Sequence, residues 1–442
     1  MSELTTNLGA VQQIHKAPAP DHSTSMFPRL GPGLVTGAAD DDPSGIATYS
    51  QVGAQFGFGM LWTMLFSFPL MAAIQEICAR LGRITGVGVA ENLRRHYPKS
   101  LVYAVVLLLC VANTFNLGAD ISAMGAAAQL VFGGAASAYA VFLGILSLLL
   151  QIYVPYRHYI RYLKWLTLVL FAYVATAFVV RVPWSAALRA TVVPWLSFDS
   201  GYWMALVAVL GTTISPYLFF WQTSQEAEEI RANRGQFPLK RKPSQAFEQL
   251  RRIATDTKIG MAFSNAVAFF IILVTAVTLN ASGTGKGIQT ASEAAEALKP
   301  LAGQLAFALF ALGIIGTGML AVPVLAGSAA YAVSEAFRWR ASLDRRPRQA
   351  PQFYVVLSAA TSIGILLSLV GIDPMRALYW SAVLNGVVAV PLMFMLMSLS
   401  TKKTVVGKFV LPAYLRSAGW FATGAMFLAS LGFLAFAIRG AH

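Results

Sequence analysis

The sequence predicts an all-α polytopic membrane protein with about eleven transmembrane helices, two of them interrupted. Of its 442 residues, 57% are hydrophobic and only 12% are charged, and the mean hydropathy is +0.62. A soluble domain carries about twice that charged fraction. Apolar runs long enough to cross a bilayer recur from Leu34 to Ile438, and two of them contain a proline within a polar stretch.

The expected transmembrane segments follow the apolar runs in chain order. We place them at 31–57 (broken), 60–81, 101–132, 138–155, 163–180, 202–224 (broken), 257–280, 300–335, 352–371, 376–398 and 417–438. Residues 29–442 are therefore expected to form a single transmembrane domain. Residues 1–28 are polar, contain proline and lack the apolar core of a signal peptide, so we expect a disordered cytoplasmic tail. The polar stretch 226–256 is expected to be a cytoplasmic loop.

The net charge of +14 follows the membrane topology and does not require a nucleic-acid partner. With the N-terminus in the cytoplasm, six of the 33 Lys and Arg residues face outside and the other 27 face the cytoplasm. The six are Arg181, Arg189, Lys286, Lys299, Arg376 and Arg439. This positive-inside bias predicts a cytoplasmic N-terminus and an external C-terminus. The lipid bilayer is the expected surroundings, with no nucleic acid and no obligate protein partner.

The sequence contains no motif that is typical of an enzyme active site. All five histidines lie in tails or loops, and Cys78 and Cys110 lie within apolar segments, where neither is expected to form a disulfide. There is no HExxH, P-loop or nucleophile motif. We therefore expect neither an enzyme nor a resident cofactor.

The first interrupted segment carries three consecutive aspartates. Asp40, Asp41 and Asp42 lie between two apolar stretches and are followed by Pro43 and Gly45. One carboxylate near the bilayer centre costs about 2.5–3.5 kcal/mol on the lenient insertion scale. A continuous helix is not expected, because proline has no backbone N–H and glycine tolerates almost any backbone angle. A broken helix with acidic side chains at membrane depth predicts a cation site that lines a cavity.

The second interruption lies five helices later, at residues 212–217 (TTISPY). Two proline-broken segments at this separation predict an inverted repeat of segments 1–5 and 6–10, plus one extra helix, with both breaks near the midplane. The first half-helices would end near Ala38–Ala39 and Gly211–Thr212 with unpaired carbonyls of partial negative charge. Together with Asp42, these carbonyls would form an oxygen-rich cage for a cation.

Five stretches add a more specific signal: GPGLVTGAADDDPSG (31–45), QEICARLGRITGVGVAENLRRHYP (75–98), NLGADISAMGAA (116–127), TTISPY (212–217) and SLSTKKTVVGKF (398–409). Together they resemble the Nramp family of metal transporters over nearly the whole chain. The resemblance implies a LeuT-type fold with eleven or twelve helices and a divalent metal ion as substrate. It also implies alternating access in a bacterial-type inner or plasma membrane.

Two departures from the family motifs bear on the ion. Where Nramp carries DPGN the chain has DPSG (42–45), and where Nramp carries MPH it has SPY (215–217). Gly45 thus replaces the metal-binding Asn, and Ser215 replaces the Met whose thioether favours soft or borderline ions. An all-oxygen site with room for water suits Mg²⁺, which sheds its waters reluctantly. The chain is in this respect similar to the Nramp-related branch that transports hydrated Mg²⁺, and the expected metal site comprises Asp42, Gly45, Thr212 and Ser215.

Proton coupling is expected to be weak or absent. The resemblance implies an acidic pair in segment 3 and a histidine in segment 6 as proton carriers. Asp120 matches the first acidic position, but Ala123 occupies the second and Tyr217 replaces the histidine. An uncoupled carrier can still accumulate a divalent cation, since two charges at 100 mV are worth about 4.6 kcal/mol.

Several polar residues near the breaks have two interpretations. Asp40 and Asp41 either line the aqueous path or serve as helix caps or a solvated loop. Ser44 is expected to cap the following half-helix rather than touch metal. Ser215 offers a hydroxyl or back-bonds to a helix carbonyl, and for Thr212 we favour the carbonyl as the ligand.

The remaining candidate site residues lie further from the breaks or are not expected to bind the cation directly. Tyr217 is expected to pack or gate. Glu76 is an intramembrane acid that either lines the pathway or pairs with Arg80 at helical spacing. Asn385 either donates to the broken backbone or makes a plain helix–helix contact.

Two other functions compete with hard-cation transport. One is a proton-coupled Mn²⁺/Fe²⁺ symporter of the Nramp type. The other, of a different class, is an amino-acid or organic-cation symporter on the same fold, whose substrate carboxylate Asp42 would repel.

Overall fold

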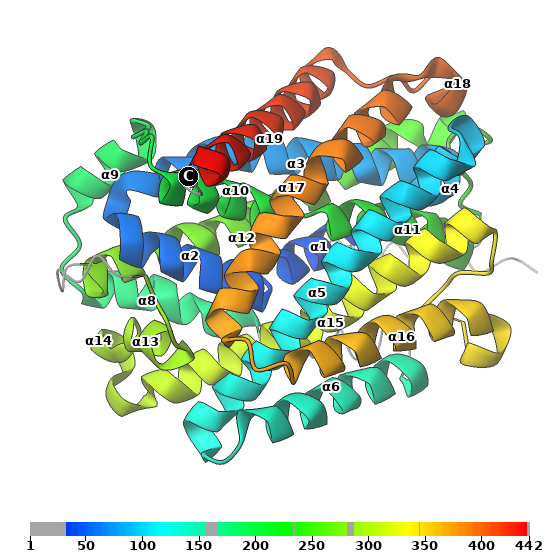
Figure 1. Ribbon diagram of the computed structural model, residues 1–442. Coiled ribbons are helices and arrows are strands. Elements are labelled where there is room, and N and C mark those ends of the chain that lie inside the picture. Colours follow the sequence, from blue (N-terminus) through cyan, green and yellow to red (C-terminus); the bar gives the residue numbers. More distant parts are fainter. Residues whose placement is uncertain (1–31, 155–166, 234, 281–286, 344, 440–442) are drawn as a thin grey trace, which may run out of the picture.

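The computed structural model describes residues 32–154, 167–233, 235–280, 287–343 and 345–439, and its regular elements there are helices. Most of them run along one common direction, as Figure 1 shows. The elements are α1 (Pro32–Asp40), α2 (Pro43–Phe56), α3 (Trp62–Thr85), α4 (Val89–His96), α5 (Lys99–Phe132), α6 (Ala136–Tyr153), α8 (Phe171–Val179), α9 (Trp184–Val192), α10 (Ser200–Thr213), α11 (Pro216–Ala232), α12 (Ala246–Thr278), α13 (Ala291–Glu296), α14 (Lys299–Ala302), α15 (Ala306–Phe337), α16 (Pro351–Ser368), α17 (Pro374–Thr401), α18 (Lys403–Val406) and α19 (Ala413–Arg439).

The described helices agree with the expected eleven membrane segments. Nine spans are long and apolar enough to cross a membrane, counting α10 and α11 together as Ser200–Ala232. The broken pair α1 and α2 and the shorter apolar helix Thr167–Val179 supply the other two. The tail 1–28 and the first part of the fifth segment lie outside the described residues.

One loop prediction is wrong. The stretch 226–256 is not a loop throughout, because α11 continues to Ala232 and α12 already begins at Ala246. Polar residues at both ends extend these two helices beyond the apolar core, so only residues between them connect the helices. A hydropathy boundary therefore marks the end of the apolar stretch and not the end of the helix.

The two halves pack around a common centre. The half-helices α1 and α2 lie along α12, while α11 lies along α3, and α3 and α12 contact each other. Each half thus places its broken helix on the second helix of the other half, the arrangement that an inverted repeat produces. The third helices of the two halves, α5 and α15, also pack along each other.

Glycine permits the closest of these contacts. A Cβ atom on Gly37 of α1 would lie 2.3 Å from the carbonyl oxygen of Gly260 on α12. A Cβ atom on Gly211 of α10 would lie 2.4 Å from the backbone nitrogen of Gly386 on α17. Small residues at helix crossings let backbones approach closely in membranes. The broken helices are therefore held by backbone proximity on both sides of the centre.

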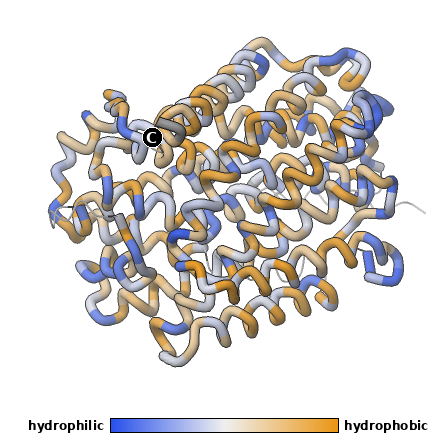
Figure 2. Tube along the Cα trace, in the orientation of Figure 1, coloured by the Kyte–Doolittle hydropathy of each residue, from blue (hydrophilic) through white to orange (hydrophobic). Residues whose placement is uncertain are grey.

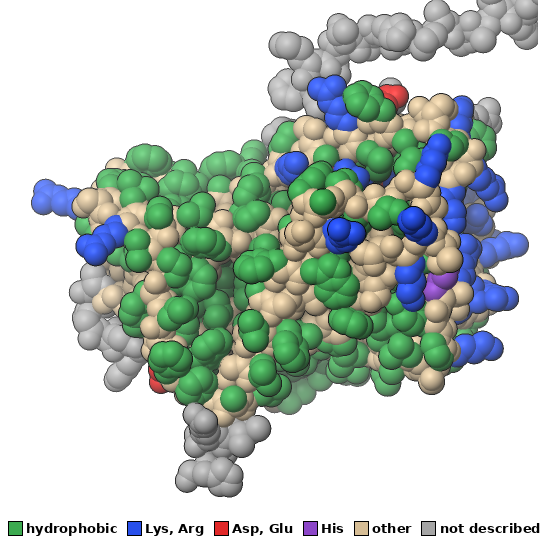
Figure 3. Space-filling model, turned by 90° about the horizontal axis from the view of Figure 1, so that it is seen from above, with side chains coloured by type: hydrophobic (Ala, Val, Ile, Leu, Met, Phe, Trp, Pro, Cys, Tyr) green, Lys and Arg blue, Asp and Glu red, His purple; other side chains and the backbone are tan. Residues whose placement is uncertain are grey.

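The surface has an apolar middle and a basic end. Figure 2 shows hydrophobic residues along the helices and hydrophilic ones gathered toward their ends. Large apolar side chains such as Leu107, Phe142 and Leu366 are exposed at 65%, 61% and 64%. Figure 3 shows most Lys and Arg side chains gathered at one end of the molecule, which we call the basic end. An apolar girdle with charges beyond it is the surface of a membrane-spanning protein.

Candidate cation site

The first break exposes Asp42 between two half-helices. α1 ends at Asp40 and α2 begins at Pro43, which suits the first helical position because its missing N–H is not needed there. Asp42 has extended backbone angles (φ −71°, ψ 168°), and its Oδ1 accepts the backbone N–H of Gly45 at 2.8 Å. The expected break is confirmed.

The expected cap is wrong, because Asp42 and not Ser44 caps α2. The Ser44 hydroxyl donates to Asp42 Oδ1 at 2.6 Å instead. Ser44 already lies in the first turn of α2, where its side chain cannot reach back to the N–H groups that a capping residue serves. Both interactions hold the Asp42 carboxylate in one orientation.

The second break is also present, and a serine hydroxyl covers its carbonyls. α10 ends at Thr213 and α11 begins at Pro216. The Ser215 hydroxyl lies 2.9 Å from the carbonyl oxygen of Gly211 and 2.7 Å from that of Thr212. The hydroxyl has one proton, so it can donate to only one of these oxygens at a time. Back-bonding, one of the two interpretations of Ser215, is what the structure has.

The two breaks meet. A Cβ atom on Gly45 would lie 3.1 Å from Thr212 Oγ1, so a larger side chain at 45 would press on the second break. The Tyr217 hydroxyl donates to the Ala39 carbonyl oxygen at 3.1 Å and lies 3.5 Å from Asp42 Oδ2. Tyr217 therefore links the carbonyl end of α1 to the carboxylate, and it is more than a packing residue.

Two further helices orient Asp42 through residues that the sequence reasoning missed. Asn116 on α5 donates its Nδ2 to Asp42 Oδ2 at 3.2 Å, and Ser381 on α17 donates to Asn116 Oδ1 at 2.8 Å. Asn116 opens the stretch 116–127 and is a polar residue in an apolar helix, which was the available signal. A serine such as Ser381 gives no such signal, because serine is common in membrane helices.

The other two aspartates of the triplet are held apart from Asp42. Asp40 Oδ2 lies 2.6 Å and Asp41 Oδ1 lies 3.0 Å from the hydroxyl of Ser264 on α12. Both side chains are buried, at 0% and 1% exposure, so a solvated loop is the wrong interpretation. In the part of the chain that the structure describes, no three His, Cys, Asp or Glu side chains converge as a metal cluster. A cation here would have to use mixed oxygen donors.

Unsatisfied oxygen atoms surround the breaks. Considering described residues only, Asp40 Oδ1 and Asp41 Oδ2 are buried without a hydrogen-bond partner, and the buried hydroxyls of Thr212 and Tyr49 have only each other as partners. Buried polar groups normally have partners, and those without one indicate a bound water, an ion or a functional role. Their concentration at the breaks marks this region as the place where a cation or its water ligands would bind.

The structure gives different results for the candidate residues that lie further from the breaks. Glu76 pairs with Arg80 at 2.7 Å, which is the pairing interpretation. Asp120 is fully buried, and neither of its oxygens has a partner among the described residues. Asn385 is also buried, and neither side-chain atom forms a hydrogen bond within the described ranges, so of its two interpretations the bond to the broken backbone is not made.

A buried ionic network lies at the basic end. Glu226 on α11 is fully buried and accepts from Arg252 on α12 at 2.9 Å, with Arg83 on α3 at 4.0 Å. Arg252 also contacts Glu229 at 3.0 Å. Asp256 on α12 accepts the Gly33 backbone N–H at 2.7 Å. The ends of four helices are thus joined here by buried charged groups.

A buried carboxylate at the meeting point of two interrupted helices, each packed on the opposite half, defines a multi-pass membrane protein of the inverted-repeat transporter class. The profile of the Nramp family, described as natural resistance-associated macrophage protein-like, matches residues 33–436. The chain belongs to the Nramp family.

Curated relatives extend over most of the chain. The divalent metal cation transporter MntH of Klebsiella pneumoniae subsp. pneumoniae is 27% identical over 402 residues, which cover 88% of this chain and 90% of that protein. MntH of Yersinia pestis is 28% identical over 357 residues, covering 76% and 80%. These relatives are metal transporters and not enzymes.

Solved structures of low sequence identity share the fold. A mutant of the Eremococcus coleocola manganese transporter matches with a TM-score of 0.72 at 16% identity, covering 91% of this chain and 85% of that one. Mhp1, a nucleobase-cation-symport-1 family transporter, matches with a TM-score of 0.56 at 13% identity, covering 93% of each. The expected LeuT-type fold is confirmed.

Proposed function

We propose that this protein carries divalent cations across a membrane by alternating access, with Asp42 as the central ligand and a preference for hard ions such as Mg²⁺, and also Mn²⁺. The observation that carries the proposal is the surroundings of Asp42. Its carboxylate is 1% exposed and lies where the two breaks meet. The side chains that contact it or line the second break end in hydroxyl or amide groups.

The side chains around Asp42 offer hard oxygen donors, and this favours a hard cation. The side chains that reach Asp42 are those of Ser44, Asn116 and Tyr217, and Thr212 and Ser215 stand at the second break. Oxygen ligands suit Mg²⁺ and Mn²⁺, whereas thioether ligands select softer metals. The Tyr217 hydroxyl already joins two acceptors, the Ala39 carbonyl and Asp42. Both become available to a cation when this hydroxyl rotates away.

The thioether of Met124 lies in the neighbourhood of the first break. A Cβ atom on Gly318 would lie 2.6 Å from Met124 Sδ and 3.3 Å from Pro43 Cγ, so the thioether packs near the proline of the first break. Met124 is not among the groups that hydrogen-bond to Asp42. We therefore assign it to packing, and its substitution separates packing from softness.

Mn²⁺ transport is the second candidate. The curated relatives are divalent metal cation transporters, and one of the solved structures that share the fold is a manganese transporter. Mn²⁺ also accepts oxygen ligands, so the site chemistry is compatible with both ions. We propose in addition that proton coupling is weak or absent, since Tyr217 offers no imidazole and Asp120 is the one carboxyl left from the family's acidic pair.

An organic substrate has less support. An amino acid would bring a second carboxylate next to Asp42, and two neighbouring like charges repel strongly in a buried site. The likeness to Mhp1 shows a shared fold and does not argue for a shared substrate.

The test is uptake into proteoliposomes that contain the purified full-length protein. Radiolabelled Mg²⁺ and Mn²⁺ are supplied separately, with Cd²⁺ as competitor, to wild type and to Asp42→Ala, which should be inactive with both ions. Ser215→Met should raise Cd²⁺ block relative to Ser215→Ala, which removes the same hydroxyl without adding sulfur. Strong Cd²⁺ block of the wild type with no Mg²⁺ uptake would overturn the hard-ion preference.

Coupling is measured in the same vesicles. A pH-sensitive dye is enclosed, the membrane potential is clamped at zero, and metal is added outside. Acidification that scales with uptake and disappears in Asp120→Asn would show that the protein is a proton symporter. A flat dye signal during measurable uptake is the expected result.

The orientation is a further proposal. The basic end is expected to face the cytoplasm, with the N-terminus inside and the C-terminus outside, since Lys and Arg gather there. Accessibility of single cysteines introduced at Lys402 and at Trp184, which lie at opposite ends of the molecule, to a membrane-impermeant reagent in whole cells tests it. Labelling at residue 402 and not at residue 184 would show that the proposed orientation is wrong.

A further inference from the structure

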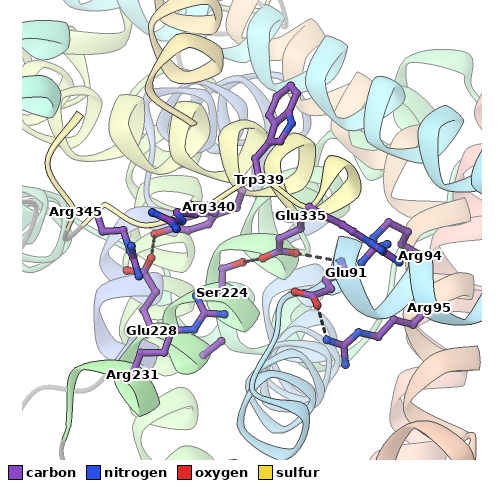
Figure 4. Close-up of a pocket in the computed structure, with 14 residues that line it drawn as sticks. Glu91, Arg94, Arg95, Ser224, Glu228, Arg231, Glu335, Trp339, Arg340 and Arg345 are labelled. Atoms are coloured by element: carbon purple, nitrogen blue, oxygen red, sulfur yellow. Dashed lines mark hydrogen bonds and ion pairs between the residues drawn. The ribbon is translucent and has the colours of Figure 1, made fainter. Parts of the chain in front are cut away.

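A cavity of about 530 Å³ opens at the basic end, away from the breaks. It lies between α4, α11, the end of α15 and the segment that follows α15 (Figure 4). Among the described residues that line it, the six basic ones are all arginine: Arg94, Arg95, Arg231, Arg338, Arg340 and Arg345. Three described glutamates, Glu91, Glu228 and Glu335, also line it, so the described lining residues carry a formal charge of +3.

The glutamates are already supplied with donors. Glu335 accepts the Ser224 hydroxyl at 2.9 Å and the Glu91 backbone N–H at 3.3 Å. Glu228 accepts the Tyr331 hydroxyl at 2.7 Å. The carboxylate of Glu91 pairs with Arg95. The acidic groups are therefore bound to the protein itself and leave most of the arginine charge unbalanced.

Five of these arginines have no carboxylate partner among the described residues. Arg94, Arg231, Arg338, Arg340 and Arg345 form no ion pair there. Figure 4 shows Arg340 and Arg345 on one side of the cavity and Arg94 on the other, with Glu335 and Ser224 between them. The positive-inside rule explains why basic residues lie at this end, but it does not explain why arginines from three segments converge on one hollow.

The segment after α15 is bent into this position at a cost. Arg338 has φ 62° and ψ 30°, the left-handed region, and it is the one non-glycine residue with positive φ in the described ranges. A residue with a Cβ atom pays about 1 kcal/mol or more there. This turn carries Arg338 and Arg340 back beside the cavity. A left-handed residue often ends a helix, and here it directs the arginines that follow α15 toward the cavity.

We propose that this arginine cavity binds the phosphate group of an anion, either a soluble phosphate compound or the headgroup of an anionic lipid. Arginine presents a planar fork of donors that matches phosphate oxygens in pairs. A volume of about 530 Å³ accommodates a diphosphate or triphosphate group or a lipid headgroup. The bound anion joins Arg94 of α4, Arg231 of α11 and the segment after α15.

Aromatic side chains beside the cavity make a headgroup a specific possibility to test. Tyr103, Phe337 and Trp339 form a continuous stack, with ring centroids 5.0 Å and 5.1 Å apart. All three are more than one-third exposed, at 38%, 49% and 38%. Aromatic rings of this kind gather at the level of lipid headgroups.

The proposal goes beyond cation transport and does not rest on it. The anion site is separate from Asp42, so binding can be measured whether or not the protein moves metal. Its expected effect is to stabilise the contact of α11 with α4 and α15, and hence the folded protein.

The test uses purified full-length protein in nanodiscs of neutral phosphatidylcholine, in metal-free buffer so that chelation does not contribute. Sodium triphosphate is titrated calorimetrically at low salt, and sodium sulfate at matched ionic strength is the reference. The wild type is compared with Arg94→Gln/Arg340→Gln/Arg345→Gln and with a control, Arg241→Gln/Arg348→Gln/Arg416→Gln. The control removes the same charge from exposed positions at the same end.

The wild type and the control should bind triphosphate more tightly than sulfate, and the cavity variant should bind it at least about tenfold more weakly, the equivalent of about 1.4 kcal/mol. Unfolding temperatures measured without ligand show whether each variant is folded. If the triple cavity variant does not fold, the single variant Arg340→Gln replaces it, because Arg340 is exposed and lies outside any helix. Equal affinity of cavity variant and control overturns the proposal.

A second arm identifies the source of the phosphate. The titration is repeated in nanodiscs that contain phosphatidylglycerol. Weaker triphosphate binding by the wild type in these discs, with no such change for the cavity variant, shows that a headgroup occupies the site. Unchanged binding shows a soluble anion. If the wild type binds no triphosphate in neutral discs and phosphatidylglycerol stabilises it no more than the cavity variant, the proposal fails.

Discussion

Replacing Asn116 by alanine should weaken cation binding without unfolding the protein. Asn116 Nδ2 lies 3.2 Å from Asp42 Oδ2, and its Oδ1 is held by Ser381 at 2.8 Å, so the amide is oriented before it reaches the carboxylate. A hydrogen bond to a charged group contributes about 1.5–3 kcal/mol. The side chains that orient a metal ligand are worth about 10–100-fold in affinity, or about 1.4–2.8 kcal/mol. The two estimates agree.

The assay is the concentration dependence of Mg²⁺ and Mn²⁺ uptake in proteoliposomes. We expect Asn116→Ala to raise KM by about 10–100-fold for both ions. Asn113→Ala is the matched control, because Asn113 is buried one turn earlier on α5 and donates to the Leu325 carbonyl oxygen at 3.1 Å, away from Asp42. It should lower the unfolding temperature and leave KM unchanged. A KM within about twofold of wild type for Asn116→Ala, or equal increases for both variants, would refute the reasoning.

Three further predictions concern packing, the ionic network and ion softness. Gly37→Ala should destabilise the protein by about 1–3 kcal/mol, since its Cβ would overlap the Gly260 carbonyl; an unchanged unfolding temperature would count against the contact of α1 with α12. Arg252→Ala should lower the stability of the folded protein by about 3 kcal/mol, which is the low end for a buried ion pair because Arg252 is 26% exposed. Arg95→Ala should lower it by less than about 1 kcal/mol, because the pair of Arg95 with a neighbouring glutamate is exposed. Similar thermal or denaturant stability of these two variants would contradict the burial argument. Met124→Leu should leave the ratio of Cd²⁺ block to Mg²⁺ uptake unchanged, and a drop in Cd²⁺ block would make its sulfur a ligand.

Local chemistry explains why the breaks were predicted so closely. Pro43 and Pro216 each remove a backbone donor, and each stands at the first position of a half-helix in the structure. Acidic residues in an apolar run also announce burial, and Asp42 is indeed buried at the break. Such signals depend on residues within a few positions of one another, so a sequence displays them directly.

Hydrogen-bond partners across helices were predicted poorly. Asn116, Ser264 and Ser381 were not singled out, although all three contact the aspartates or their partner. These bonds join residues more than 70 positions apart, and which ones form depends on the rotation and register of packed helices.

The sequence by itself determined that this is a membrane protein with two interrupted helices, a carboxylate at the first break and a basic end. Hydropathy, proline and charge act over short stretches of chain, so these properties needed no knowledge of packing. Only the tertiary structure decided that Tyr217 bridges the two breaks, that Glu226 is buried in an ionic network and that arginines from three segments surround one cavity. Each of these depends on the distance between segments remote in the sequence, and that distance is set by the close packing of helices.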